Sequence, residues 1–137
     1  WGRISGPWTR GKRYWRTRLA RNPSHTDARR IVDCLLGKKA QDVRLMDMRA
    51  ATDIADYFVV CHGDSDTHVK AITEAVLDGM QGRGRRPWHT EGVQHLRWVL
   101  IDYVDVVVHV FQRDERDFYG LERLWNDAKT TAFGAPA

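Results

Sequence analysis

This chain of 137 residues has few cysteines, no long apolar run and no internal repeat. Two cysteines, Cys34 and Cys61, cannot build a disulfide framework, so the core must rest on apolar burial, as expected in a reducing compartment. No segment approaches the roughly 18 apolar residues that a membrane span requires. These shortages exclude a disulfide-stapled secreted mini-protein and a transmembrane protein.

The overall composition is that of a globular protein, with 42% hydrophobic and 29% charged residues. At roughly 100–200 residues per domain, the length allows one compact domain with an extension. We therefore expect a single core, and we divide the chain into an arm over residues 1–25, a domain over 26–128 and a loose C-terminal tail over 129–137.

Charge is distributed unevenly along the chain, although the net charge is only +4. Residues 1–25 contain seven basic side chains and no acidic one, whereas residues 90–127 contain eight acidic and four basic side chains. An acidic face attracts basic partners and repels phosphate backbones. The C-terminal part of the domain therefore favours a basic protein as its partner.

The basic N-terminal arm is repeatedly interrupted by glycine and proline, so we predict that residues 1–25 are flexible. Its basic side chains are interleaved with tryptophans, a pattern that suits RNA binding through charge and stacking. A disordered leader, a fragment of a longer reading frame and an organelle transit peptide are the alternatives. Localisation is accordingly expected to be cytoplasmic, or in an organelle matrix if the arm is a transit peptide.

Hydrophobic periodicity predicts helices and strands in alternation along the domain. A helix capped by Ser24 or Thr26 comes first, and a helix capped by Asp114 with Phe118, Leu121, Leu124 and Trp125 on one face comes last. Between them we expect strands over 42–46, 57–61, 88–90, 98–101 and 106–111, with 57–61 in the middle of the sheet and the last two joined as a hairpin. A further helix, capped by Asp64, Ser65 or Asp66, should follow the central strand and carry Val69, Ile72, Val76 and Met80 along one side. This order predicts an α/β or α+β fold, in which helices pack on a mixed sheet.

Residues capable of chemistry are present, but their spacing is not that of a known site. Zinc could use Cys61, His62, His68 and His89, yet there is no Cys-x-x-Cys pair and core packing explains the cysteines better. A Cys61–His89 nucleophile pair is likewise unsupported by spacing. The alternative function is a metal-dependent nucleotidyl transferase-like enzyme, with phosphates at Gly63 and Ser65 and magnesium at Asp102 and Asp105.

Aromatic residues mixed with charged ones give a clearer signal near the C-terminus. Trp98, Tyr103, Phe118 and Tyr119 are interspersed with Asp102, Asp105, Arg116 and Asp117. Protein interfaces use aromatic anchors with polar rims, so we interpret this region as a docking surface, although some of the aromatics, Phe118 first, are expected in the core.

Three sequence strings in this order resemble one family. ADYFVVCHGDSD (55–66), TEGVQHLRWVLIDYVDVVVHVF (90–111) and RDFYGLERLW (116–125) are similar to the ribosomal silencing factor family, also called the Iojap family. The resemblance covers roughly residues 27–127. It implies a nucleotidyl transferase-like fold without catalytic carboxylates, and a non-enzyme without metal or cofactor.

The resemblance also implies a function and a partner. Family members bind the large ribosomal subunit through ribosomal protein L-fourteen, block subunit joining, and so repress translation; they have a role in large-subunit biogenesis and form homodimers when free. The matching positions, which we expect to bind the partner, are Trp98, Leu100, Asp102, Tyr103, Asp105, Arg116, Asp117, Phe118 and Tyr119.

The basic arm over residues 1–25 has no counterpart in the family, and from its charge alone we expect it to contact ribosomal RNA. Within the domain, the chain departs from the family pattern at two places. Val104 stands where many relatives have glycine, so a turn with positive φ would be strained there. Cys61, His62, Thr67 and His68 also differ from the usual residues around Gly63, which puts a role for that loop in doubt.

Overall fold

Strand β2 (Tyr57–Gly63) is buried on both faces along its whole length, as its continuous apolar run predicts. In the computed structural model, which describes residues 23–134, β2 pairs in parallel with β5 (Val106–Gln112) and antiparallel with β1 (Gln41–Asp47). A parallel pair needs a long crossover connection. The segment between β2 and β5, which includes helix α3 (Asp66–Gln81), supplies it.

The described residues form a six-stranded sheet in the order β3-β4-β5-β2-β1-β6. Its remaining strands are β3 (His89–Glu91), β4 (Trp98–Asp102) and β6 (Lys129–Phe133), each antiparallel to its neighbours. A mixed sheet packed by helices confirms the predicted α+β class. The described part of the chain contains no helix with the length and hydrophobicity of a membrane span.

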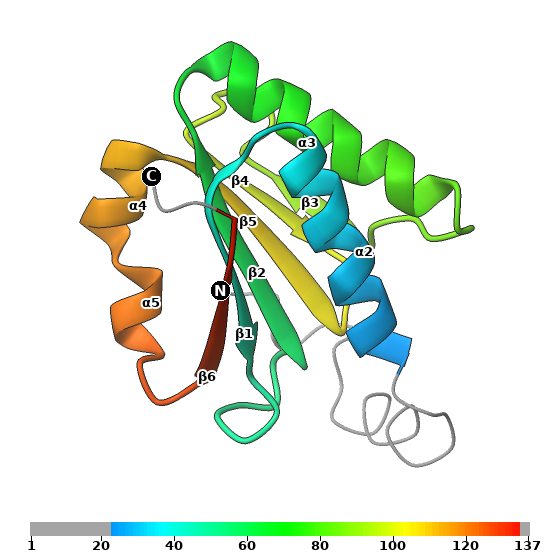
Figure 1. Cartoon of the computed structure of the whole chain (residues 1–137), viewed down its shortest axis with the longest axis vertical. Helices are drawn as coiled ribbons and strands as arrows, with labels where there is room; N and C mark the ends of the chain where they lie inside the picture. Colours follow the sequence, from blue (N-terminus) through cyan, green and yellow to red (C-terminus); the bar gives the residue numbers. More distant parts are fainter. Residues whose placement is uncertain (1–22, 135–137) are drawn as a thin grey trace.

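Helices cover both faces of the sheet (Figure 1). Helix α2 (Pro23–Gly37) lies beside α3 on one face, whereas α4 (Arg113–Tyr119) and α5 (Leu121–Leu124) lie on the other. Alternation along β5 divides its side chains accordingly: Val108 joins the core under α2 and α3, and Phe111 joins the core under α4 and α5.

The prediction of one continuous helix over residues 114–125 is wrong, because two short helices occupy this segment. Gly120 adopts a left-handed conformation with φ 57°, so α4 ends there and α5 begins at a different angle. Phe118 and Leu124 are therefore 78% and 70% exposed, not buried on one shared face as expected. The N-cap of α4 is Gln112 and not Asp114.

Both ends of the domain differ from the predicted boundaries. Helix α2 already includes residues 23–25, and Ser24 lies inside it, where its Oγ donates a hydrogen bond to Asp56 Oδ2 at 2.9 Å. Ser24 and Thr26 are thus helical residues and not N-caps. The tail predicted to be loose forms β6 over Lys129–Phe133, because its backbone completes the open edge of β1. The arm's first 22 residues lie outside the described residues.

The turn between β4 and β5 is unusually tight. Val104 has φ 76°, and Asp105 N–H donates to the carbonyl of Tyr103 at 3.0 Å, which closes a γ-turn around Val104. Asp102 Oδ1 accepts a hydrogen bond from Val104 N–H at 2.8 Å. The strain predicted for a non-glycine residue at this position is therefore present.

Candidate docking surface

Aromatic side chains from β4 and α4 meet on the face of the sheet that α4 and α5 cover. We define the aromatic surface as Trp98, Phe118 and Tyr119. The Tyr119 ring centroid lies 4.7 Å from that of Trp98 and 5.1 Å from that of Phe118. Phe118 is 78% exposed and Tyr119 53% exposed, whereas Trp98 is half-buried. Large apolar side chains that are exposed next to one another are typical of an interaction surface and not of a core.

Trp98 connects this surface to the core beneath it. Its ring stacks on Phe111 at a centroid distance of 4.8 Å, and its Nε1–H donates to His109 Nδ1 at 3.1 Å. His109 is fully buried and also meets the ring of Phe58 edge-on. Trp98 is consequently held rigidly, so the aromatic surface rests on a fixed platform.

Arg116 was predicted to face a partner, but its side chain is only 5% exposed. Its guanidinium donates two hydrogen bonds to Glu122, at 3.0 and 2.9 Å, and one to His62 Nδ1 at 2.9 Å. A bidentate arginine–carboxylate pair is a strong and directional contact. Arg116 therefore acts inside the protein, where it joins α4 to α5 and to β2.

Four other predicted contact residues are also buried. Leu100 belongs to the core under α4 and α5, and Tyr103 belongs to the core under α2 and α3. Asp102 and Asp105 are 0% and 2% exposed. Burial also raises the pKa of the Tyr103 hydroxyl, so this group stays neutral. These residues shape the hairpin, and a partner cannot reach their side chains in this conformation.

The exposed residues available for docking are therefore fewer than predicted, with one addition. Asp117 is exposed next to Phe118, so its predicted contact with a partner stays a prediction. Leu124, on α5, is 70% exposed and was assigned to the core by its helical spacing. Gly120 was the sequence signal that could have corrected this assignment, because glycine commonly ends helices.

Residues 90–127 carry more acidic than basic side chains even when the buried ones are set aside. Asp102, Asp105 and Arg116 are buried, which leaves three arginines and six acids over residues 90–127. The six acids are Glu91, Asp114, Glu115, Asp117, Glu122 and Asp127. Two of these acids are paired with arginines, Glu122 with Arg116 and Glu115 with Arg97. The excess of acids therefore describes the whole segment 90–127, and this segment suits a basic protein partner.

The geometry argues against the alternative magnesium site. Gly63 pairs with Gln112 at one end of the β2–β5 ladder, whereas the Asp105 carbonyl accepts from Tyr57 N–H at the other end. Six residues of strand separate these ends, which corresponds to about 20 Å. Phosphates at Gly63 and a metal at Asp105 could therefore not take part in one reaction.

The other candidate chemistry is also dispersed. Cys61 is fully buried, and burial raises the pKa of its thiol to about 12, so it does not supply a thiolate nucleophile. His68 contacts Asp64 and the carbonyl of Lys38, and His89 contacts Glu91. Within residues 23–134, no three His, Cys, Asp or Glu side chains are grouped as a metal ion would require.

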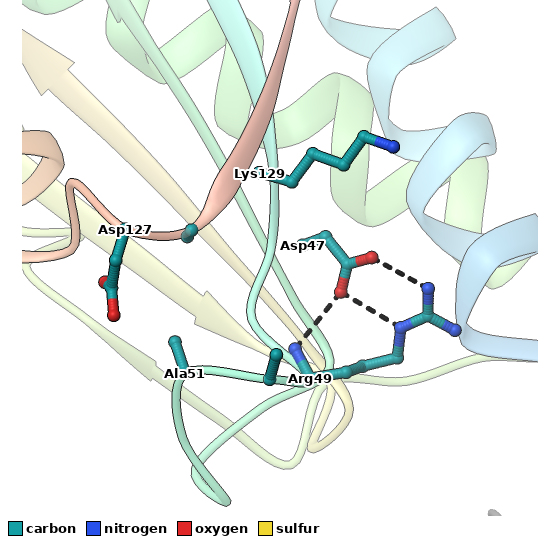
Figure 2. A pocket seen from close by; sticks show the side chains of 7 residues that line it. Asp47, Arg49, Ala51, Asp127 and Lys129 are labelled. Atoms are coloured by element: carbon teal, nitrogen blue, oxygen red, sulfur yellow. Dashed lines mark hydrogen bonds and ion pairs between the residues drawn. The ribbon is translucent and has the colours of Figure 1, made fainter.

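A hollow of about 580 Å³ lies where β1 ends and β6 begins (Figure 2). Asp47 accepts hydrogen bonds from Arg49 Nη2 at 2.7 Å and Nε at 2.9 Å, so these two charges of the lining neutralise each other. Lys129 and Asp127 add one further charge of each sign to the lining. The lining offers no convergent set of free groups, so we do not regard it as the functional site.

Fold and surface together define a small α+β protein that exposes aromatic side chains on one face of its sheet, beside a rigidly packed tryptophan. Residues 21–136 match the family described as "Ribosomal silencing factor during starvation". The chain belongs to this family, which confirms the resemblance noted in the sequence.

Individual relatives agree with this assignment. The chain is 47% identical to ribosomal silencing factor RsfS of Bacillus subtilis, over 66% of this chain and 77% of the relative. It is 46% identical to ribosomal silencing factor RsfS of Halalkalibacterium halodurans, over 72% of this chain and 85% of the relative. A crystal structure of a Chromobacterium violaceum protein is similar with a TM-score of 0.73 and 30% identity, over 82% of this chain and 94% of that one.

Proposed function

We propose that this protein binds the large ribosomal subunit through ribosomal protein L-fourteen, prevents the small subunit from joining, and so represses translation. Membership of the ribosomal silencing factor family supports a ribosomal partner and a regulatory role. A role in large-subunit biogenesis, a cytoplasmic location and a homodimeric free state belong to the same proposal. The observation that carries it is the exposure of Phe118 and Tyr119 beside the fixed ring of Trp98.

Docking of this kind needs no chemical step. The aromatic rings supply apolar area that a partner can bury, and the excess of acids over residues 90–127 favours a basic partner and disfavours RNA phosphates. A domain held on the joining face of the large subunit then excludes the small subunit by its volume alone. The proposal therefore assigns no catalytic residue and no cofactor.

Cosedimentation with isolated large and small ribosomal subunits tests the proposal, and Phe118→Ala is the best variant for it. Because Phe118 is 78% exposed, we expect its truncation to change the free energy of unfolding by no more than about 0.5 kcal/mol. As an interface anchor, however, its loss should weaken large-subunit binding by about 2 kcal/mol or more. Trp98→Ala is less suitable, because it also removes packing against Phe111.

Leu36→Ala provides the matched control. Leu36 is an apolar side chain exposed to 37% on α2, on the opposite face of the sheet, so its truncation should leave binding unchanged. Equal binding of the wild-type and Phe118→Ala proteins, or equal binding to both subunits, would contradict the proposal.

A further inference from the structure

Helix α4 is attached to the domain in an unusual way. The structure describes all of residues 113–119, and among them Arg116 is the single buried residue. The helix has only seven residues, and its N-cap makes no side-chain hydrogen bond. So short a helix is not stable by itself and normally depends on a buried apolar face. Here a single guanidinium takes much of that role.

The Arg116 guanidinium reaches three other elements. Besides its bidentate pair with Glu122 on α5, it donates to His62 Nδ1 on β2 at 2.9 Å and to the Gln41 carbonyl on β1 at 3.4 Å. Its Nη2 also lies 3.8 Å from a carboxylate oxygen of Asp42. Phe118 follows Arg116 by two residues and Tyr119 by three, so these contacts determine where the aromatic surface lies.

The contact with His62 fixes the protonation state of the imidazole. An arginine always donates, so Nδ1 must be the acceptor, and the single ring proton of neutral His62 lies on Nε2. His62 is 3% exposed, and its Nε2 has no hydrogen-bond partner among the described residues. A second proton would have to occupy Nδ1, where it would face the guanidinium of Arg116.

We propose that Arg116 is the positioning residue of the docking surface, and that its bond to neutral His62 is a latch that opens when His62 gains a proton. The inference rests on the proposed function, because the surface that it positions is the one proposed to bind the ribosome. Protonation would replace a hydrogen bond by repulsion between two cations inside the protein. Helix α4, with Phe118 and Tyr119, would then lose its connection to β2.

The charges around His62 agree with this direction. Burial lowers the pKa of His62, and the positive charges of Arg116 and Arg113 lower it further, whereas Asp42 and Asp117 oppose the shift. The Glu122 carboxylate pairs with the same guanidinium, so the positive charge of Arg116 is held beside His62. Because the pKa of His62 is lower in the folded state, the latch makes its full contribution to the free energy of unfolding at pH values above the ordinary pKa of histidine. Its contribution declines as the pH falls below that value.

An NMR titration of the full chain tests the latch directly. Between about pH 8 and pH 5, the range in which histidines change charge, we expect the His62 ring signal and the amide signals of residues 113–119 to shift with one midpoint below the ordinary histidine pKa. His62→Gln retains an acceptor for Arg116 but cannot gain a proton, so its α4 signals should not change with pH. His89→Gln, which alters a histidine paired with Glu91 on β3, should titrate like the wild type.

Binding measurements complete the test. Affinity for the large subunit should fall on the order of tenfold across this range in the wild type, but not in His62→Gln. Arg116→Lys keeps the charge without the bidentate geometry and should give the low-pH α4 signals at every pH. Amide signals of α4 that ignore pH, or that still titrate in His62→Gln, would overturn the latch. A latch seen by NMR without any ribosome binding would instead refute the proposed function alone.

Discussion

Arg116 and Phe118 show how two residues of one short helix can have opposite roles. Sequence analysis placed both on the docking surface, yet the arginine is 5% exposed and the phenylalanine 78% exposed. The usual preference would bury the aromatic residue and expose the charge. Here Glu122, His62 and Asp42 compensate the buried cation, which leaves Phe118 free on the outside. The inversion itself points to function, because exposing phenylalanine has no benefit for folding.

Val104 carries strain that a single substitution should relieve. A β-branched residue with φ 76° at the centre of a γ-turn costs on the order of 1–3 kcal/mol. Glycine adopts positive φ freely, although it loses more entropy on folding, by roughly 0.5–1 kcal/mol. We therefore predict that Val104→Gly raises the free energy of unfolding in urea by about 1 kcal/mol.

Val104→Ala separates this effect from a simple loss of side-chain volume. Alanine retains a Cβ atom and the strain at positive φ, so the substitution should not stabilise the protein. Equal gains from Gly and Ala would mean that crowding of the valine side chain, and not its backbone conformation, is the source of strain.

Among the secondary-structure elements, those with a strong apolar pattern could be predicted from the sequence. The continuous apolar run over 57–61 predicted a central strand, which extends to Gly63 as β2, and Ser65 was among the expected caps of α3, whose N-cap it is. The β4–β5 hairpin was also predicted, because both strands are rich in β-branched and aromatic residues. In each case local propensity and burial favour the same structure.

The elements that sequence analysis missed depend on distant contacts. Strand β6 has exposed polar residues, so its pattern gives no signal; it forms because β1 offers an unpaired edge. The helical spacing of Phe118, Leu121 and Leu124 suggested one face, but the left-handed Gly120 divides it. The candidate docking residues could therefore be proposed from the sequence, whereas which of them are exposed could not be predicted.

Removal of β6 should weaken the whole sheet, contrary to the expectation for a loose tail. Truncation after Ala128 would expose the backbone edge of β1 and remove Phe133, which packs on the core and lies under Arg29 at 4.9 Å. Each lost hydrogen bond removes about 1 kcal/mol net, and the conformational entropy that the tail no longer loses on folding offsets part of this. We therefore expect the free energy of unfolding to fall by about 2 kcal/mol. Urea unfolding and hydrogen exchange of the β1 amides measure it.

A shorter truncation serves as the comparison for β6. Removing only residues 135–137 leaves β6 intact, so stability and β1 exchange should match the wild type. If both truncations behave alike, β6 does not stabilise the sheet.

At the scale of the whole molecule, the larger apolar core and the proposed docking surface lie on opposite faces of the sheet. Helices α2 and α3 cover one side of the sheet with a conventional apolar core, whereas the shorter α4 and α5 present exposed aromatic and apolar residues on the other (Figure 1). A domain built this way can commit one face to a partner without losing its main core. The part of the domain that does not contact the partner can then exclude the small ribosomal subunit, as the proposed function requires.

Steric exclusion predicts a particular dose dependence for the block of subunit joining. Because each bound protein occludes one large subunit and nothing is turned over, inhibition should rise in proportion to occupancy and saturate near one protein per large subunit. Sucrose-gradient analysis of mixed subunits at increasing protein concentration measures this relation. Phe118→Ala should shift the curve to higher concentration, roughly 30-fold for a loss of about 2 kcal/mol, with the same plateau. Complete inhibition at amounts far below one protein per subunit would instead require a reaction that persists after the protein leaves, and steric exclusion would be refuted.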